Sequence, residues 1–234
     1  MRPSEIIIAL DCAGAAEALA LNDRIAVPGA VVKIGKELFT REGPPIVREF
    51  VARGQRVFLD LKFHDIPNTV AAACRAAADL GAWMINVHCS GGPTMLRAAR
   101  ASLADLTSRP LLIGVTVLTS LDAAELNTIG ITDSPAVQVA RLTHLARASG
   151  LDGVVCSPHE IAQVKLACGD EFVTVSPGIR PGDARQDDQQ RTATAAFAAR
   201  AGGDFIVVGR PITRATDPAA AYRALQAEMV GAIF

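Results

Sequence analysis

The segment RVFLDLK, residues 56–62, decides the fold. It is a short run whose apolar residues scarcely alternate with polar ones, and its charges after Arg56 come only at the carboxyl end. A strand that is apolar on both faces is typical of a parallel sheet covered by helices. The question is then how many such runs the chain contains.

Seven further runs of this kind are separated by alanine-rich segments with helical periodicity. The strand-like runs are 6–11, 30–34, 83–89, 111–117, 152–156, 171–175 and 204–208, and clear helical segments include 65–80, 93–106, 134–148, 192–201 and 217–230. Eight strand–helix units favour a closed barrel over an open doubly wound sheet. We therefore predict an α/β protein with a single (β/α)₈ TIM barrel domain over residues 1–234.

Composition limits the function further. The 234 residues are 50% hydrophobic and 20% charged, with a net charge of -1. That composition supports a large core, and the absence of a basic cluster argues against nucleic acid as a partner. The apolar run after the N-terminus is too short for a signal peptide or membrane span, so we expect a cytoplasmic protein. The five cysteines form no Cys-x-x-Cys pair, and Cys156 with His159 lacks the second pair that a zinc site needs.

Charged residues gather where the first three strands are expected to end. They are Asp11, Lys33, Asp60 and Lys62, with Asp65 in the loop that follows. Residues 60 and 62 are two apart, so they should share one face of their strand. An isolated Asp-x-Lys is more often a structural ion pair, and Asp65 alone could be a helix cap. Two lysines and two aspartates at one rim are costly to desolvate, which favours a functional site.

A phosphate site is expected in the loops after the seventh and eighth strands. Ser176–Arg180 (SPGIR) follows the seventh strand and Gly209–Ile212 (GRPI) follows the eighth. Glycine exposes backbone N–H groups, arginine supplies a bidentate fork, and a short helix can begin at Pro211. The irregular stretch 176–191 is long enough to be a lid. His88 is expected to be structural, and the sequence leaves open whether Thr119 and Ser120 contact a ligand or form an ordinary turn.

These segments resemble the bacterial orotidine 5′-phosphate decarboxylases along nearly the whole chain. LDLKFHDIPNT at 59–69 is the most specific match. The other matching segments, in the same order as in that family, are ALD at 9–11, VKIG at 32–35, GVTVLTS at 114–120, SPGIRP at 176–181, DDQQR at 187–191 and GDFIVVGRPIT at 203–213.

The resemblance implies a carboxy-lyase that makes UMP from OMP without metal or other cofactor. Lys62 would be the proton donor, within an array of Lys33, Asp60, Lys62 and Asp65 in which Asp65 comes from the partner subunit of a homodimer. Asp11 and Lys33 would contact the ribose. The remaining implied contacts with the substrate are Asp60, Ile66, Thr69, Thr119 or Ser120 at the pyrimidine, Pro177, Arg180, and Gln189, Gly209 and Arg210 at the phosphate.

Two other functions are weighed against this one. The first is a magnesium-dependent sugar-phosphate decarboxylase or aldolase of the same superfamily, which would need a set of oxygen ligands. Lys33 and Lys62 crowd the aspartates and argue against a cation there. The second is a barrel that only binds a phosphate ligand, which would have no need for a proton donor.

Overall fold

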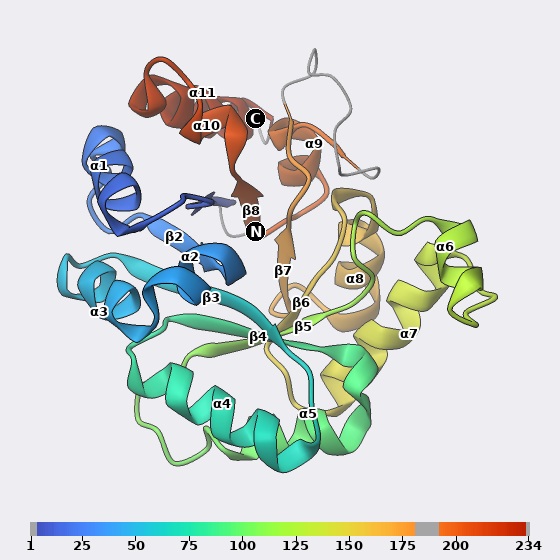
Figure 1. Ribbon diagram of the computed structural model, residues 1–234. Coiled ribbons are helices and arrows are strands. Elements are labelled where there is room, and N and C mark those ends of the chain that lie inside the picture. The colour runs from blue at the N-terminus through green and yellow to red at the C-terminus, as the bar shows by residue number, and fades with distance from the viewer. Residues whose placement is uncertain (1–3, 181–191, 233–234) are drawn as a thin grey trace.

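Eight parallel strands close into a barrel in the computed structural model, which describes residues 4–180 and 192–232 (Figure 1). The strands follow one another in sequence order, and β1 also pairs with β8, with Ile7 opposite Val207. They are β1 (Glu5–Ala9), β2 (Val31–Gly35), β3 (Arg56–Phe63), β4 (Met84–His88), β5 (Leu111–Val115), β6 (Gly153–Val155), β7 (Val173–Ser176) and β8 (Phe205–Val208). The predicted (β/α)₈ barrel is confirmed.

Helices surround this barrel on its outside (Figure 1). The α-helices are α1 (Ala15–Ile25), α2 (Lys36–Glu42), α3 (Pro44–Ala52), α4 (Pro67–Asp79), α5 (Gly92–Ala101), α6 (Ala123–Thr128), α7 (Pro135–Ala148), α8 (Ile161–Cys168), α9 (Ala195–Arg200), α10 (Arg210–Thr213) and α11 (Pro218–Gly231), and the 3₁₀ turns are η1 (Cys89–Gly91) and η2 (Pro158–Glu160). Among the described residues, no helix is both long and apolar enough to cross a membrane.

Most element boundaries lie within a few residues of the predicted ones. Helix α7 begins at Pro135 after the N-cap Ser134, whose hydroxyl accepts a hydrogen bond from the Val137 N–H. Proline suits the first helical turn because its missing N–H would have no partner there. The helix expected over 93–106 is shorter and ends at Ala101, and the strand expected over 171–175 runs instead from Val173 to Ser176.

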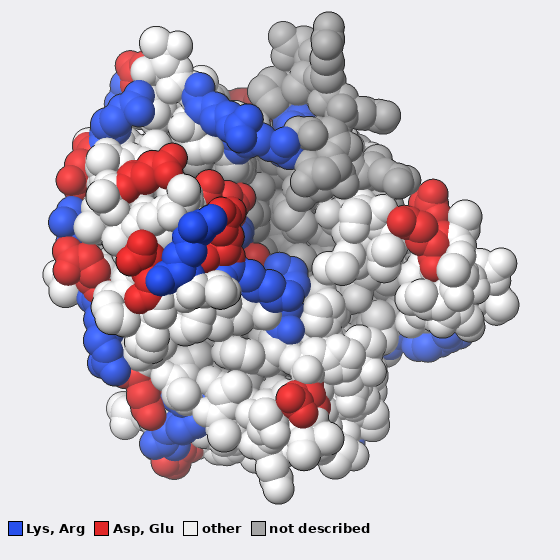
Figure 2. All heavy atoms as spheres, in the orientation of Figure 1, with Lys and Arg blue, Asp and Glu red and all other residues white. Residues whose placement is uncertain are grey.

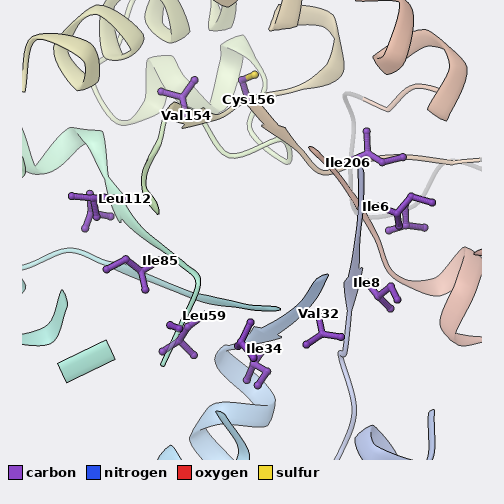
Figure 3. Packing of buried hydrophobic residues seen from close by; sticks show 14 of the residues in the cluster. Ile6, Ile8, Val32, Ile34, Leu59, Ile85, Leu112, Val154, Cys156 and Ile206 are labelled. Carbon is purple, nitrogen blue, oxygen red and sulfur yellow. The ribbon is translucent and has the colours of Figure 1, made fainter. Parts of the chain in front are cut away.

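Two apolar layers hold the barrel together. The inner layer fills the barrel and contains Ile7, Ala9, Val31, Phe58, Met84, Ile113, Val175 and Val207. The outer layer lies between strands and helices, and Figure 3 shows part of it, from Ile6 and Ile8 on β1 to Ile206 on β8. Neighbouring strand residues alternate between the layers, which explains why these strands are apolar on both faces.

Candidate active site

The barrel's inner face becomes polar just above the inner apolar layer. The next inward residues on the first four strands are Asp11, Lys33, Asp60 and Asn86, whereas β7 and β8 place Pro177 and Gly209 there. Figure 2 shows a hollow in this face of the molecule, with acidic and basic side chains gathered on the side of α1, α2 and β3. At this level the inner face is therefore polar on the side of β1–β4 and carries proline and glycine on the side of β7 and β8.

A cavity of about 260 Å³ opens at this rim. It is lined by Ala9, Asp11, Lys33, Phe58, Asp60, Lys62, Val155, Val175, Pro177, Gly178, Arg180, Val207, Gly209 and Arg210. Eight of the predicted site residues are thus brought together from strands that are far apart in sequence. The floor is apolar, which lowers the local dielectric and strengthens the electrostatic interactions above it.

Four charges alternate in sign along one wall of the cavity. Lys33 Nζ lies 3.3 Å from Asp11 Oδ1 and 3.4 Å from Asp60 Oδ2. Lys62 Nζ lies 2.6 Å from Asp60 Oδ1 and donates a hydrogen bond to it. Asp60 is therefore held between two ammonium groups, and only 8% of its surface is exposed.

The array keeps its buried members ionised. Burial alone would raise the pKa of Asp60, but the charges of Lys33 and Lys62 outweigh that effect and hold its pKa below the ordinary value. Burial alone would lower the pKa of Lys33, but the carboxylates of Asp60 and Asp11 outweigh it and raise that pKa. A carboxylate and an ammonium thus face the cavity fully charged at neutral pH.

Lys62 reaches this position through an irregular backbone. Between Leu59 and Phe63, β3 advances four residues while β4 advances only two, from Ile85 to Val87. Lys62 lies in this bulge with a φ of 53°, in the left-handed region that side chains other than glycine rarely adopt. Strict alternation along a regular strand, on which the predicted pairing of residues 60 and 62 depended, is therefore not what places Lys62 beside Asp60.

Asn86 contacts two residues of the charge array, although no role for it was predicted from the sequence. Its side chain is fully buried on β4, where it accepts a hydrogen bond from the Lys62 N–H at 2.8 Å and donates one to Asp60 Oδ1 at 2.7 Å. Its position in the sequence could have predicted this role. Asn86 comes two residues after Met84 of the inner layer, just as Asp60 comes two residues after Phe58. A polar residue at that level of a barrel strand faces the site.

On the side of β7 and β8, the cavity is lined by Arg180 and Arg210 and by Pro177, Gly178 and Gly209. The loop after β7 is fastened by the Arg180 N–H, which donates to the Ala193 carbonyl at 3.0 Å, and by the Ala193 N–H, which donates to Gly178 at 3.1 Å. Helix α10 begins at Arg210, one residue before the expected Pro211. Gln189 and most of the expected lid lie outside the described residues.

Several predicted site residues lie away from the main cavity. Asp65 and Ile66 are exposed and line a separate, open depression with His64, Pro67, Ser90 and Gly91. Asp65 Oδ1 accepts a hydrogen bond from the Ile66 N–H at 2.6 Å, but the N-cap of α4 is Ile66 rather than Asp65. Thr69 is exposed on α4. The single chain therefore does not bring these three residues to the charge array.

Thr119 and Ser120, whose roles the sequence left open, differ in their burial. Thr119 is buried and Ser120 is exposed, and neither lines the cavity.

His88 is buried enough to lose its charge. Burial, with smaller effects from His64 and Lys62, lowers the pKa of His88 to about 4, so its ring is neutral at neutral pH. It packs against His64 with 5.4 Å between ring centroids. Within residues 4–180 and 192–232, no three His, Cys, Asp or Glu side chains are placed to hold a metal ion.

Comparisons with known proteins agree with this geometry. The family model described as Orotidine 5'-phosphate decarboxylase / HUMPS family matches residues 4–225. Relatives named orotidine 5'-phosphate decarboxylase include one from Chromobacterium violaceum, 54% identical with 97% of this chain and 92% of the relative covered, and one from Halorhodospira halophila, 55% identical with 98% of each covered. The crystal structure of orotidine 5'-phosphate decarboxylase from Lactobacillus acidophilus matches with a TM-score of 0.86 and 38% identity, covering 97% of this chain and 99% of that one.

These matches define the class as well as the family. The closed barrel, with a charged cavity at the carboxyl ends of its strands, has the architecture of a (β/α)₈-barrel enzyme. The chain belongs to the orotidine 5'-phosphate decarboxylase / HUMPS family.

Proposed function

We propose that this chain converts orotidine 5′-monophosphate to uridine 5′-monophosphate and carbon dioxide, the last step of de novo UMP synthesis. The observation that carries the proposal is the Lys62 ammonium, held 2.6 Å from Asp60 in a cavity that Arg180 and Arg210 also line. A substrate with a phosphate at one end and a reacting ring carbon at the other matches that arrangement. The names of the relatives support the same substrate.

The chemistry follows from the fixed ammonium. The bond between the ring carbon and its carboxylate breaks, carbon dioxide leaves, and the electron pair stays on the ring carbon. Lys62 stabilises that developing negative charge and then delivers its proton to the same carbon. The resulting amine regains a proton from solvent, so the protein ends the cycle unchanged.

Other residues are assigned to binding. Asp11 and Lys33 contact the ribose hydroxyls, and backbone at Pro177 and Gly209 with the Arg180 and Arg210 side chains surrounds the phosphate, where Gln189 joins them. Thr119 or Ser120 meets the pyrimidine. Phosphate contacts remote from the reacting carbon contribute binding energy that lowers the barrier.

The remaining predicted residues belong to a shared site. We propose a homodimer in which Asp65, Ile66 and Thr69 of one subunit complete the cavity of the other. Their exposure in the single chain, beside an open depression, supports an arrangement in which a second copy covers them. We place the enzyme in the cytoplasm, because its substrate and product are charged nucleotides that do not cross membranes unaided.

The deciding experiment is a turnover assay on OMP with the purified chain before and after dialysis against EDTA. We expect UMP and carbon dioxide to form at the same rate in both samples, because lysine supplies the positive charge. A loss of activity that magnesium restores would favour the sugar-phosphate enzyme. Binding of UMP without turnover of OMP would favour the barrel that only binds a phosphate ligand.

A further inference from the structure

Asn86 joins two residues of the proposed catalytic array without lining the cavity. It is fully buried on β4, and both ends of its amide are used, the oxygen by the Lys62 N–H and the nitrogen by Asp60. The orientation of this amide follows from its partners, because an N–H can only donate and an ionised carboxylate can only accept. The side chain therefore has a single satisfied orientation.

The first bond supports the unusual backbone of Lys62. The register shift between β3 and β4 separates two ladder pairs, Leu59 with Ile85 and Phe63 with Val87. Within that gap the Lys62 N–H donates a hydrogen bond to the side-chain oxygen of Asn86 at 2.8 Å. The bond thus holds the residue at the φ of 53° from which its side chain enters the cavity.

The second bond orients Asp60. Its Oδ1 accepts hydrogen bonds from both Asn86 Nδ2, at 2.7 Å, and Lys62 Nζ, at 2.6 Å, while Oδ2 faces Lys33 Nζ at 3.4 Å. The amide prevents the carboxylate from rotating, so each oxygen keeps its own ammonium. Lys62 is thereby held at both ends, by its backbone and by its charged tip.

We infer that Asn86 is a positioning residue that sets the place of the Lys62 ammonium through these two hydrogen bonds. The inference rests on the proposed function, in which Lys62 protonates the ring carbon. Asparagine suits the task because one short side chain supplies an acceptor and a donor at opposite positions. Aspartate would keep the acceptor but set a second carboxylate against Asp60, and alanine would remove both bonds.

The test compares Asn86→Ala and Asn86→Asp with a matched control. Thr116→Val also removes a buried side-chain hydrogen bond, from the Thr116 hydroxyl to the Val155 carbonyl at 2.7 Å, but Thr116 does not contact the array. For both Asn86 variants we expect kcat on OMP to fall by roughly 100-fold or more, the scale of an error of about 1 Å in placing a reacting group. The Kd for UMP and the KM should stay within a few-fold of wild type, and the control should keep its kcat.

Crystal structures of the same variants supply a measurement independent of turnover. We expect Lys62 Nζ to move away from Asp60 Oδ1 in Asn86→Ala, and the Asp60 carboxylate to rotate in Asn86→Asp. The inference is overturned if Lys62 stays in place, or if kcat falls only as far as in Thr116→Val. If the wild type does not decarboxylate OMP, the proposed function fails, and the position of Lys62 in the variants still decides whether Asn86 positions it. Should Asn86→Ala not fold, Asn86→Asp, which has the same shape as the native side chain, decides in its place.

Discussion

Lys62 combines a charged contact with a strained backbone. Its ammonium lies 2.6 Å from Asp60, and its φ of 53° places a residue with a Cβ in a region that costs about 1–3 kcal/mol. A regular strand would avoid that cost. Strain of this kind is kept where surrounding bonds compensate for it, here those of Asn86 and Asp60.

Replacing Lys62 by alanine and by glycine separates charge from strain. Both variants lose the ammonium, so we expect nearly all OMP turnover to disappear while UMP binding persists. Because only glycine adopts this backbone without a Cβ clash, Lys62→Gly should be more stable to urea unfolding than Lys62→Ala by about 1 kcal/mol. Substantial decarboxylation by either pure variant would refute the assigned proton donor, and equal stabilities would refute the strain.

Substitution of Arg210 tests the proposed phosphate-binding side of the cavity. Its side chain lines the cavity beside Gly209, where the phosphate is proposed to bind. We expect Arg210→Ala to raise the KM for OMP by roughly 100-fold, because charge-assisted bonds to a dianion are lost. Turnover of orotidine, which lacks the phosphate, should change little. Equal losses on both substrates would show that Arg210 acts elsewhere than on the phosphate.

Among the elements, β6 and β7 approach each other closely where Gly153 of β6 pairs with Val173 of β7. A Cβ added to Gly153 would lie 2.0 Å from the Val173 carbonyl oxygen, whereas one added to Gly231 at the end of α11 would meet nothing within 4 Å. The absence of a side chain at 153 is therefore a packing requirement of the barrel wall. Gly231 has no such constraint.

These two glycines form a matched pair of variants. Gly153→Ala should lower the free energy of unfolding by about 3 kcal/mol, because a strand backbone must move to make room. Gly231→Ala should leave it unchanged or raise it by less than about 1 kcal/mol, since alanine is the better helix former. Urea denaturation of both measures the difference, and comparable stabilities would mean that β6 and β7 can separate at little cost.

For the whole molecule, the distribution of charge indicates how the site is completed. Asp11, Lys33, Asp60 and Lys62 form a continuous array within one chain, while Asp65 stays exposed beyond the end of β3. A single chain therefore supplies three of the four predicted catalytic residues to the cavity. A second copy is the proposed source of the fourth.

Complementation between inactive variants tests this shared site. Lys62→Ala retains Asp65, and Asp65→Ala retains Lys62, so a mixed dimer would hold one intact site and one doubly damaged site. With random pairing after co-expression, roughly a quarter of wild-type activity should return. If Asp65 acted within its own chain, every site would carry one lesion, and the mixture would be no more active than the separate variants.

The sequence by itself determined the barrel and most of the residues of the charged rim. Burial on both faces of a strand and the change to helical periodicity are local patterns, and eight repeats of them leave few alternatives to a barrel. Asp11, Lys33, Asp60 and Lys62 were predicted because parallel strands bring their carboxyl ends to one rim. The phosphate-side loops were predicted from the same count of strands.

Tertiary structure alone decided how those residues meet. The bulge in β3, the left-handed backbone of Lys62 and the two bonds of Asn86 depend on the register between β3 and β4, which is set by closure of the whole barrel. The burial of Thr119 and the exposure of Asp65 likewise depend on how loops pack against distant elements. Local patterns carry no information on register between strands, so the sequence identified the charged residues but not the asparagine that holds them in place.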